Sequence, residues 1–269
     1  MIEILIIAAI LFLLYLLSLR GRTGHPVLEA MQGFHYAHRG LHGNGIPENS
    51  MAAFRAAKAA GYGLELDIHL MADGNLAVIH DSSLKRTAGV DVKITDLTAD
   101  LLPDYPLEET EEIIPLLPQI LELYRGAAPL IIELKPDGNN HGALVDAAVK
   151  AMEGYQGTWC MESFDPRCVR HLRMNHAEVC RGQLSFNFFT EDNGVAPWLK
   201  FALTHNMLNF ITLPDFVAYS FDHRKQTISN FFCRKFWKLQ GVSWTIRSLE
   251  DCNTAKKEAW LPIFEYFTP

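Results

Sequence analysis

The sequence lacks the cysteine pattern of a disulfide framework or of a thiolate metal site. Its five cysteines are odd in number, and no two of them stand at CxxC spacing. Disulfide scaffolds need paired cysteines, and zinc sites built on thiolates need closely spaced ones. Neither is therefore expected, and we interpret the cysteines as free thiols in a reducing compartment.

The chain also lacks an excess of positive charge. It has 24 lysines and arginines against 31 aspartates and glutamates, and neither sign forms a long run. A nucleic-acid-binding domain needs a basic face to meet phosphates, so no nucleic-acid partner is expected. The 269 residues contain no internal repeat or low-complexity tract. They could form two small domains or one α/β barrel, a fold of about 250 residues.

One long hydrophobic run is present at the N-terminus. Residues 4–19 are apolar at all but two positions. At about 1.5 Å per residue they span roughly 24 Å, against ~30 Å for a hydrocarbon core. A cleavable signal peptide is the alternative, but it would need a basic start and a small-x-small cleavage site. We therefore predict a transmembrane anchor over residues 1–20, with Arg20 and Arg22 placing the rest of the chain in the cytoplasm.

Strand and helix patterns alternate from residue 35 to the C-terminus, after a linker over residues 21–34. Strands are predicted over 35–37, 64–70, 76–79, 129–134, 158–163, 183–186, 210–213, 242–247 and 262–267. Helices are predicted over 51–60, 116–124, 143–152, 166–175, 198–205, 227–239 and 249–258. Repeated βα units predict a (β/α)8 TIM barrel over residues 35–269, with a loop or small cap at 82–115. No eighth helix follows the last strand, and residues 20–33 are predicted to cover that flank.

Polar side chains mark the ends of three otherwise apolar strands. They are His38-Arg39-Gly40, Glu65-x-Asp67 and Glu133-x-Lys135. The alternation of a strand places Glu65 and Asp67 on one face, and functional side chains of a barrel lie at the C-terminal strand ends. The three motifs are therefore expected to meet in one site.

The residue types in these motifs indicate phosphate chemistry at a metal. The carboxylates of Glu65, Asp67 and Glu133 would repel one another without a cation, and oxygen ligands suit Mg²⁺ or Ca²⁺. Arg39 and Lys135 would then bind an anionic substrate group. Two further candidates, the histidines at positions 38 and 80, can transfer protons near neutral pH.

The order and spacing of these motifs resemble the glycerophosphodiester phosphodiesterase family. The resemblance runs from about residue 35 to the end and rests on His38-Arg39-Gly40, Pro47-Glu48-Asn49-Ser50, Ala53-Phe54, Gly61, Glu65-x-Asp67, Asp73-Gly74, His80-Asp81, Leu84, Arg86-Thr87, Gly89, Glu133-Leu134-Lys135, Ser163-Phe164-Asp165, Gly182-Gln183-Leu184 and Trp244-Thr245. It implies a TIM barrel that splits glycerophosphodiesters into glycerol 3-phosphate and an alcohol.

The resemblance also implies the role of each candidate. One divalent cation would lie on Glu65, Asp67 and Glu133, and His38 and His80 would form the acid/base pair. Arg39, Lys135 and Trp244 would bind the substrate and its phosphate. The chain departs from the family pattern in two places: Arg247 stands where Asn is common, and Glu265 lies in a last strand that commonly carries an Ile-Thr-Asp-like tip.

Two other functions stay open at this point. A lysophospholipase D-like activity on membrane lipids would suit a membrane-anchored barrel. A catalytically silent lipid-binding protein would be marked by loss of a metal ligand or a histidine, and all of these residues are present. The sequence does not distinguish a soluble diester from a lysophospholipid as the substrate.

Overall fold

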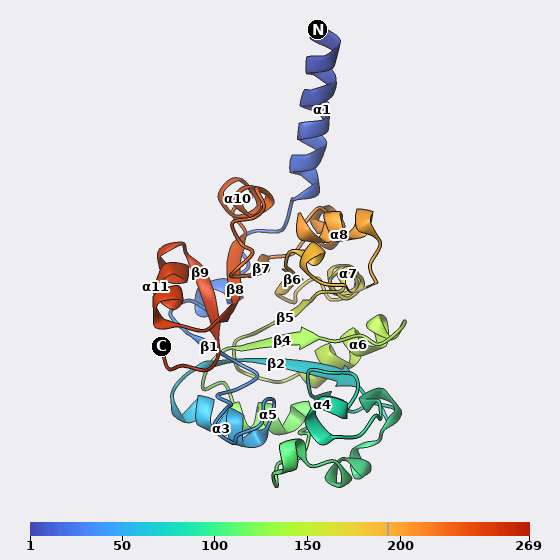
Figure 1. The fold of residues 1–269 in the computed structure, drawn as a ribbon, viewed down its shortest axis with the longest axis vertical. Helices are drawn as coiled ribbons and strands as arrows, with labels where there is room; N and C mark the ends of the chain where they lie inside the picture. Colours follow the sequence, from blue (N-terminus) through green and yellow to red (C-terminus); the bar gives the residue numbers. More distant parts are fainter. Residues whose placement is uncertain (193) are drawn as a thin grey trace.

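Eight parallel strands close into a barrel in the computed structural model, which describes residues 1–192 and 194–269 (Figure 1). The strands are β1 Tyr36–His38, β2 Gly63–Leu70, β4 Leu130–Leu134, β5 Trp159–Ser163, β6 Arg181–Ser185, β7 Phe216–Ser220, β8 Gln240–Ile246 and β9 Trp260–Phe264. The barrel closes because β1 pairs with both β9 and β2. Strand β3, Leu76–Val78, runs antiparallel to the end of β2. The predicted TIM-barrel fold is confirmed.

Helices follow the strands and form an outer layer. They are α3 Met51–Ala59, α5 Leu117–Tyr124, α6 His141–Ala151, α7 Pro166–Asn175, α8 Pro197–Thr204, α9 Asn209–Thr212, α10 Ser229–Phe231 and α11 Leu249–Lys257. Side-chain caps fix several starts: Ser50 accepts a hydrogen bond from the Ala53 amide, and Asp165 accepts one from Arg167. Such caps satisfy amides that have no partner inside the helix.

A small cap of short helices joins β3 to α5. It consists of α4 Lys85–Ala88, η1 Ile94–Asp96, η2 Ala99–Asp104 and η3 Leu107–Glu109. These helices bury their own apolar cluster, which includes Ile94, Leu102 and Leu107. The region predicted as a loop or small cap is therefore a cap with its own core.

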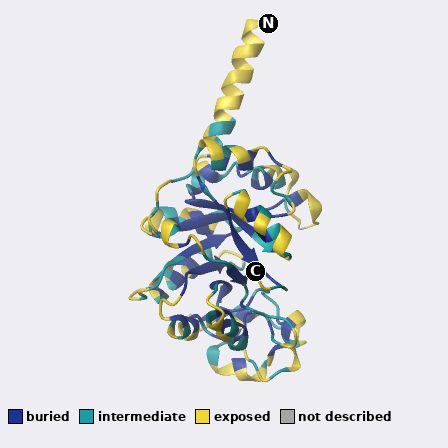
Figure 2. Ribbon diagram, turned by 90° about the vertical axis from the view of Figure 1, so that its left-hand side faces the viewer, coloured by how far each residue is buried: buried dark blue, intermediate teal, exposed yellow. Residues whose placement is uncertain are grey.

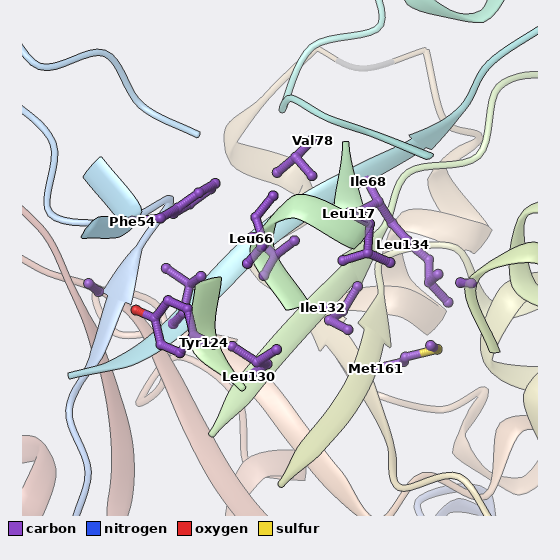
Figure 3. Packing of buried hydrophobic residues seen from close by; sticks show 14 of the residues in the cluster. Phe54, Leu66, Ile68, Val78, Leu117, Tyr124, Leu130, Ile132, Leu134 and Met161 are labelled. Atoms are coloured by element: carbon purple, nitrogen blue, oxygen red, sulfur yellow. The ribbon is translucent and has the colours of Figure 1, made fainter. Parts of the chain in front are cut away.

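The main core lies between the outer face of the sheet and the helices. Figure 3 shows Leu66, Ile68 and Ile132 of the sheet beside Phe54 and Leu117 of the covering helices, and all five are fully buried. Burying each such side chain stabilises the fold by about 1.5–3 kcal/mol. Because alternate residues of a strand face opposite ways, this outward packing leaves the polar residues of β2 inside the barrel.

The strand predicted over residues 210–213 is wrong. Residues 210–212 belong to the helical turn α9, which ends at Leu213, whose amide bonds to the Asn209 carbonyl. Leu213 then takes a left-handed conformation with φ of 41°, and Pro214 prevents the helix from continuing. The barrel strand, β7, follows two residues later.

The helix predicted over residues 227–239 is shorter than expected. Only α10 is α-helical, and η5, Phe232–Phe236, is a π-helix. Lys238, with φ of 59°, ends the segment before β8 begins.

Residues 20–33 do not cover the flank beside the last strand, so this prediction is also wrong. Arg22 pairs with Asp215 at the start of β7, with 2.6 Å between nitrogen and oxygen. Helix α2, Val27–Ala30, is followed by Met31, which packs inside the N-terminal end of the barrel against Tyr36. The segment therefore closes the bottom of the barrel. The open flank is covered by the rings of Tyr62, Phe264 and Phe267.

The N-terminal helix α1, Ile2–Ser18, projects from the barrel with its apolar surface exposed (Figures 1 and 2). Among the described residues, no helix has the length and apolarity needed to cross a membrane. The predicted transmembrane anchor over residues 1–20 is thus not supported. The 17 residues of α1 span about 26 Å, which is less than the ~30 Å thickness of a hydrocarbon core. Leu19, counted in that anchor, is instead buried beside Val217 and Leu239 of the body.

Candidate active site

Three carboxylates converge inside the barrel at the C-terminal ends of β2 and β4. The two strands are in register with Asp67 opposite Glu133, and Glu65 lies two residues earlier on the same face of β2. All three side chains are buried, and one oxygen from each lies within 4.8 Å of the others. The predicted convergence of Glu65, Asp67 and Glu133 is therefore observed.

This cluster fits a hard divalent cation. Asp67 Oδ1 and Glu133 Oε1 are buried and share the single ammonium group of Lys135, whose Nζ lies 3.2 Å and 2.7 Å from them. Buried carboxylate oxygens are costly when unsatisfied, and Mg²⁺ or Ca²⁺ takes oxygen ligands of this kind. The residues present could therefore hold such an ion.

Arg39 is the second cation beside the carboxylates. Its Nε lies 3.3 Å from Asp67 Oδ2, and its Nη1 donates to Glu48 Oε1 at 2.9 Å. Arg39 itself has φ of 54°, and its backbone amide donates to Glu65 Oε2 at 3.1 Å. Asn49 donates its amide to Asp67 Oδ2 at 2.9 Å. The turn after β1 therefore orients the carboxylates as well as supplying charge.

His38 is held by a carboxylate that directly follows the last strand. Its Nδ1 lies 2.6 Å from Glu265 Oε2, and its Nε2 lies 3.9 Å from Glu65 Oε2. Arg247 donates to the other oxygen of Glu265 from Nε at 2.8 Å and from Nη2 at 2.7 Å. Glu265 is ionised in this setting: burial opposes its ionisation, but His38, His42 and Arg247 outweigh burial and lower its pKa. A carboxylate at Nδ1 fixes the tautomer that leaves Nε2 free to accept a proton.

His80 has a similar partner on the opposite side. Its Nδ1 lies 2.6 Å from Asp81 Oδ1, while Asp81 Oδ2 accepts from Arg86 Nε at 2.6 Å. Arg86 also donates to Glu48 Oε1 at 2.6 Å. Because Glu48 bonds to Arg39 as well, a continuous chain of ion pairs joins the two sides of the site.

Burial and charge shift the pKa values of the site in opposite directions. Burial, helped by the neighbouring Asp67, raises the pKa of Glu133 to about 7. Burial also raises the pKa of Glu65 well above its usual value. For Asp67 burial is outweighed by Lys135, His80 and Arg39, and its pKa falls well below the usual range. Without a cation, Asp67 therefore favours its ionised form, whereas Glu65 and Glu133 take up protons more readily than ordinary glutamates.

Both histidines are neutral at physiological pH. Burial lowers the pKa of His38, and burial, aided by Lys135, lowers that of His80 to about 4. A neutral imidazole can accept a proton, so each ring is suited to start as a base.

A pocket of about 360 Å³ opens above the carboxylates, and one wall of it is aromatic. Trp244 and Phe164 lie edge to face with centroids 5.4 Å apart, and Phe186 packs on Phe164 at 5.8 Å. Trp244 Nε1 is buried and donates to no group within residues 1–192 and 194–269. Trp244, a predicted substrate contact, therefore faces the same pocket as the charged residues.

The structure brings together all eight residues predicted for the site, while their chemical roles remain predictions. They are His38, Arg39, Glu65, Asp67, His80, Glu133, Lys135 and Trp244. His69, a neighbouring histidine of β2, has its Nε2 3.1 Å from the His80 carbonyl oxygen.

Sequence reasoning missed one buried acid of the pocket, Glu162. It lies in register with Glu133 on β5, and its Oε2 meets no hydrogen-bond donor among the described residues. Burial, reinforced by Glu133, raises its pKa well above the usual value, which favours the protonated form. On β5, Glu162 shares its inward face with Cys160, while Met161 packs in the outer core. This period-two pattern offered a weak signal.

Comparison with known proteins gives the same picture. Residues 38–247 match the glycerophosphoryl diester phosphodiesterase family. A glycerophosphodiester phosphodiesterase of Bacillus altitudinis is 38% identical over 130 residues, which cover 45% of this chain and 53% of that protein. Lysophospholipase D GDPD1 of Rattus norvegicus is 37% identical over 118 residues, or 39% of this chain and 37% of that one. The chain thus spans about half or less of these relatives.

Solved structures share the fold over nearly the whole length. A phosphodiesterase of Oleispira antarctica, in complex with the product sn-glycerol-3-phosphate, superposes with a TM-score of 0.72 at 19% identity, covering 91% of this chain and 95% of that one. A glycerophosphodiester phosphodiesterase of Thermotoga maritima gives 0.67 at 22%, covering 87% and 95%. At such identities the likeness concerns the barrel architecture.

Proposed function

Because the chain belongs to the glycerophosphoryl diester phosphodiesterase family, we propose that it hydrolyses glycerophosphodiesters to glycerol 3-phosphate and an alcohol. One observation carries the proposal: a buried cluster of three carboxylates lies between two cations and two carboxylate-bound histidines. This combination suits a phosphodiester, which needs its charge neutralised and protons moved on both sides of the phosphorus.

A divalent cation would be held by Glu65, Asp67 and Glu133. When bound, Mg²⁺ or Ca²⁺ would offset the negative charge that grows on the phosphoryl oxygens. Arg39 and Lys135 lie on either side of Asp67 and would hold the remaining phosphate oxygens. These cations are fixed before the substrate arrives, so little reorganisation is needed.

The histidines would transfer the protons of the reaction. One of them would take the proton of the nucleophile, which is a glycerol hydroxyl of the substrate or a water. The other would supply a proton to the leaving alkoxide. Glu265 and Asp81 hold the Nδ1 atoms of His38 and His80, so each Nε2 is the nitrogen available for this exchange.

The test is product analysis with glycerophosphocholine. The purified chain with Mg²⁺ or Ca²⁺ should release glycerol 3-phosphate and choline in equal amounts. Release of phosphocholine and glycerol would mean that the other ester bond breaks, and release of nothing from several glycerophosphodiesters would reject the proposal.

A second candidate is a lysophospholipase D-like hydrolysis of lysophospholipids. The aromatic wall favours it: Phe164 and Trp244 line the pocket with ring centroids 5.4 Å apart, and Phe186 and Phe188 pack behind Phe164. Such a surface could hold an acyl chain. The same assay with lysophosphatidylcholine distinguishes the two substrates. A kcat/KM higher than that for glycerophosphocholine would favour the lysophospholipid, and a lower one would favour the soluble diester.

We also propose that the barrel works in the cytoplasm. All five cysteines are free and buried. Protease treatment of intact and lysed cells tests this location, because digestion of the barrel in intact cells would contradict it.

A further inference from the structure

A second convergence of metal-ligating side chains lies on the outer layer, where α6 packs against α7. It shares no residue with the catalytic pocket. Asp146 of α6 meets two histidines, His171 of α7 and His176 directly after it. Both imidazoles contact the same carboxylate oxygen: the Nε2 atoms of His171 and His176 lie 2.8 Å and 2.7 Å from Asp146 Oδ1.

Local backbone structure creates this convergence. Residues five apart on a regular helix do not share a face, but His176 has left the helix, with φ of −137° and ψ of 58°. The His176 amide still bonds to the Leu172 carbonyl, so the backbone leaves the helical conformation at His176. The two rings thereby come within 6.1 Å, centroid to centroid.

A glycine makes room for one ring. Gly142 lies one turn before Asp146 on α6, and a Cβ there would come within 3.2 Å of His171 Cε1. A Cβ at this position would require the imidazole to shift by a few tenths of an ångström. The helix surface is thus shaped to seat the ring beside the carboxylate.

We propose that Asp146, His171 and His176 form a binding site for Zn²⁺. One ligand atom from each residue lies within 4.8 Å of the others. Two imidazole nitrogens and one carboxylate oxygen are ligands that zinc favours, in contrast to the all-oxygen catalytic cluster. The side chains of His171 and His176 are 23% and 21% exposed, and that of Asp146 is 57% exposed, so a water can complete a tetrahedral shell.

Zinc at this position would link α6 to α7. Without the ion, both Nε2 atoms must carry a hydrogen to share one oxygen. With the ion, both Nε2 atoms are ligands and the hydrogens move to Nδ1 or leave. The site therefore joins two helices that otherwise meet through apolar packing, and ion binding stabilises the folded chain by mass action.

Zinc binding to the full chain tests the proposal. Titration calorimetry is made with Mg²⁺ in excess and in the Asp67→Asn background, which weakens the catalytic cluster. We expect about one zinc equivalent, with affinity at least about tenfold weaker in His171→Ala and in His176→Ala. His205→Ala, a change of a part-buried histidine at the end of α8, is the matched control.

Cobalt gives an independent reading. Co²⁺ bound to this site should show the visible absorption of a tetrahedral ion, and His176→Ala should lose it while keeping the circular dichroism of the parent. Turnover with Mg²⁺ should be unchanged in His176→Ala. Equal zinc affinity in the parent and both histidine variants would overturn the proposal, as would the absence of any zinc equivalent in the Asp67→Asn chain.

Discussion

At the scale of single residues, the site depends on groups that would be unstable without their partners. Asp67 is completely buried, yet its pKa is held low by Lys135, His80 and Arg39 against the effect of burial. Removing one member of such a network leaves the others buried and unpaired, which costs several kcal/mol of local stability or function. The residue-scale predictions follow from this dependence.

The first prediction concerns the metal ligands. Asp67→Asn should lower kcat by at least about 10³-fold, because it removes a ligand and leaves Arg39 and Lys135 without their shared partner. Glu65→Ala should do the same with the fold intact. Steady-state kinetics checks this, with the exposed Glu153→Gln as control. Full activity in either ligand variant would refute the site.

The second prediction concerns Glu265. Glu265→Gln should lower kcat by about 10²-fold with a smaller effect on KM, because an amide at His38 Nδ1 no longer fixes the tautomer or stabilises the protonated ring. Glu265→Asp should recover part of the activity. Arg247→Gln, which leaves the contact with His38 in place, should have a milder effect. An unchanged kcat in Glu265→Gln would show that His38 needs no carboxylate partner.

The third prediction is a pH dependence of metal binding. Since the pKa of Glu133 is raised to about 7, cation binding must displace its proton below that pH. Affinity should therefore rise with pH, by at least about tenfold per unit below pH 7, because the raised pKa of Glu65 adds to the effect of Glu133. The dependence should be weaker above pH 7, where Glu133 has already lost its proton. Calorimetry in buffers of different ionisation enthalpy measures the released protons. A pH-independent affinity between pH 5.5 and 7 would contradict the raised pKa.

At the scale of elements, the sequence predicted what depends on local pattern and missed what depends on tertiary contacts. Strand β2 was predicted because its apolar and acidic residues alternate. Residues 210–213 look like a strand, yet they form α9 because Pro214 and the left-handed Leu213 place the turn before β7. Period-two alternation also located Glu65 and Asp67. It gave only a weak sign of Glu162, and none of the His38–Glu265 contact, because that contact depends on which strands lie side by side.

The fourth prediction tests the fit between two strands. Gly182 on β6 lies so close to Phe216 of β7 that a Cβ added to Gly182 would overlap the Phe216 ring. Gly182→Ala should therefore lower the free energy of unfolding by about 1–3 kcal/mol through overpacking. Urea unfolding measures it, and Phe216→Leu in the same chain should recover part of the loss. No change in the single variant would mean that the strands shift freely.

At the scale of the whole molecule, the barrel and α1 are nearly separate bodies. The helix contacts the barrel near its own end, where Trp237 donates to the Leu16 carbonyl and Tyr15 meets Phe232. Leu19 belongs to a small buried cluster with Val217, Cys233 and Leu239 of the barrel domain. The N-terminal segment was expected to be an anchor alone, whereas its last residues are part of the folded body.

The fifth prediction follows from this boundary. Removal of residues 1–14 should leave kcat and the unfolding temperature nearly unchanged, because Tyr15, Leu16 and Leu19 remain. Removal of residues 1–20 should destabilise the barrel by about 2–4 kcal/mol, since it empties the space of a buried leucine. Thermal unfolding of the two truncated chains makes the comparison. Equal unfolding temperatures would contradict the role of Leu19.

The central claim is that this barrel splits glycerophosphodiesters with a divalent cation on Glu65, Asp67 and Glu133. The most direct measurement is glycerol 3-phosphate release from glycerophosphocholine by the full chain and by Asp67→Asn, first in EDTA and then with Mg²⁺ or Ca²⁺ restored. The claim predicts no release in EDTA, recovery by the cation in the parent chain, and no recovery in Asp67→Asn. Equal release in EDTA, or full recovery in Asp67→Asn, would contradict it.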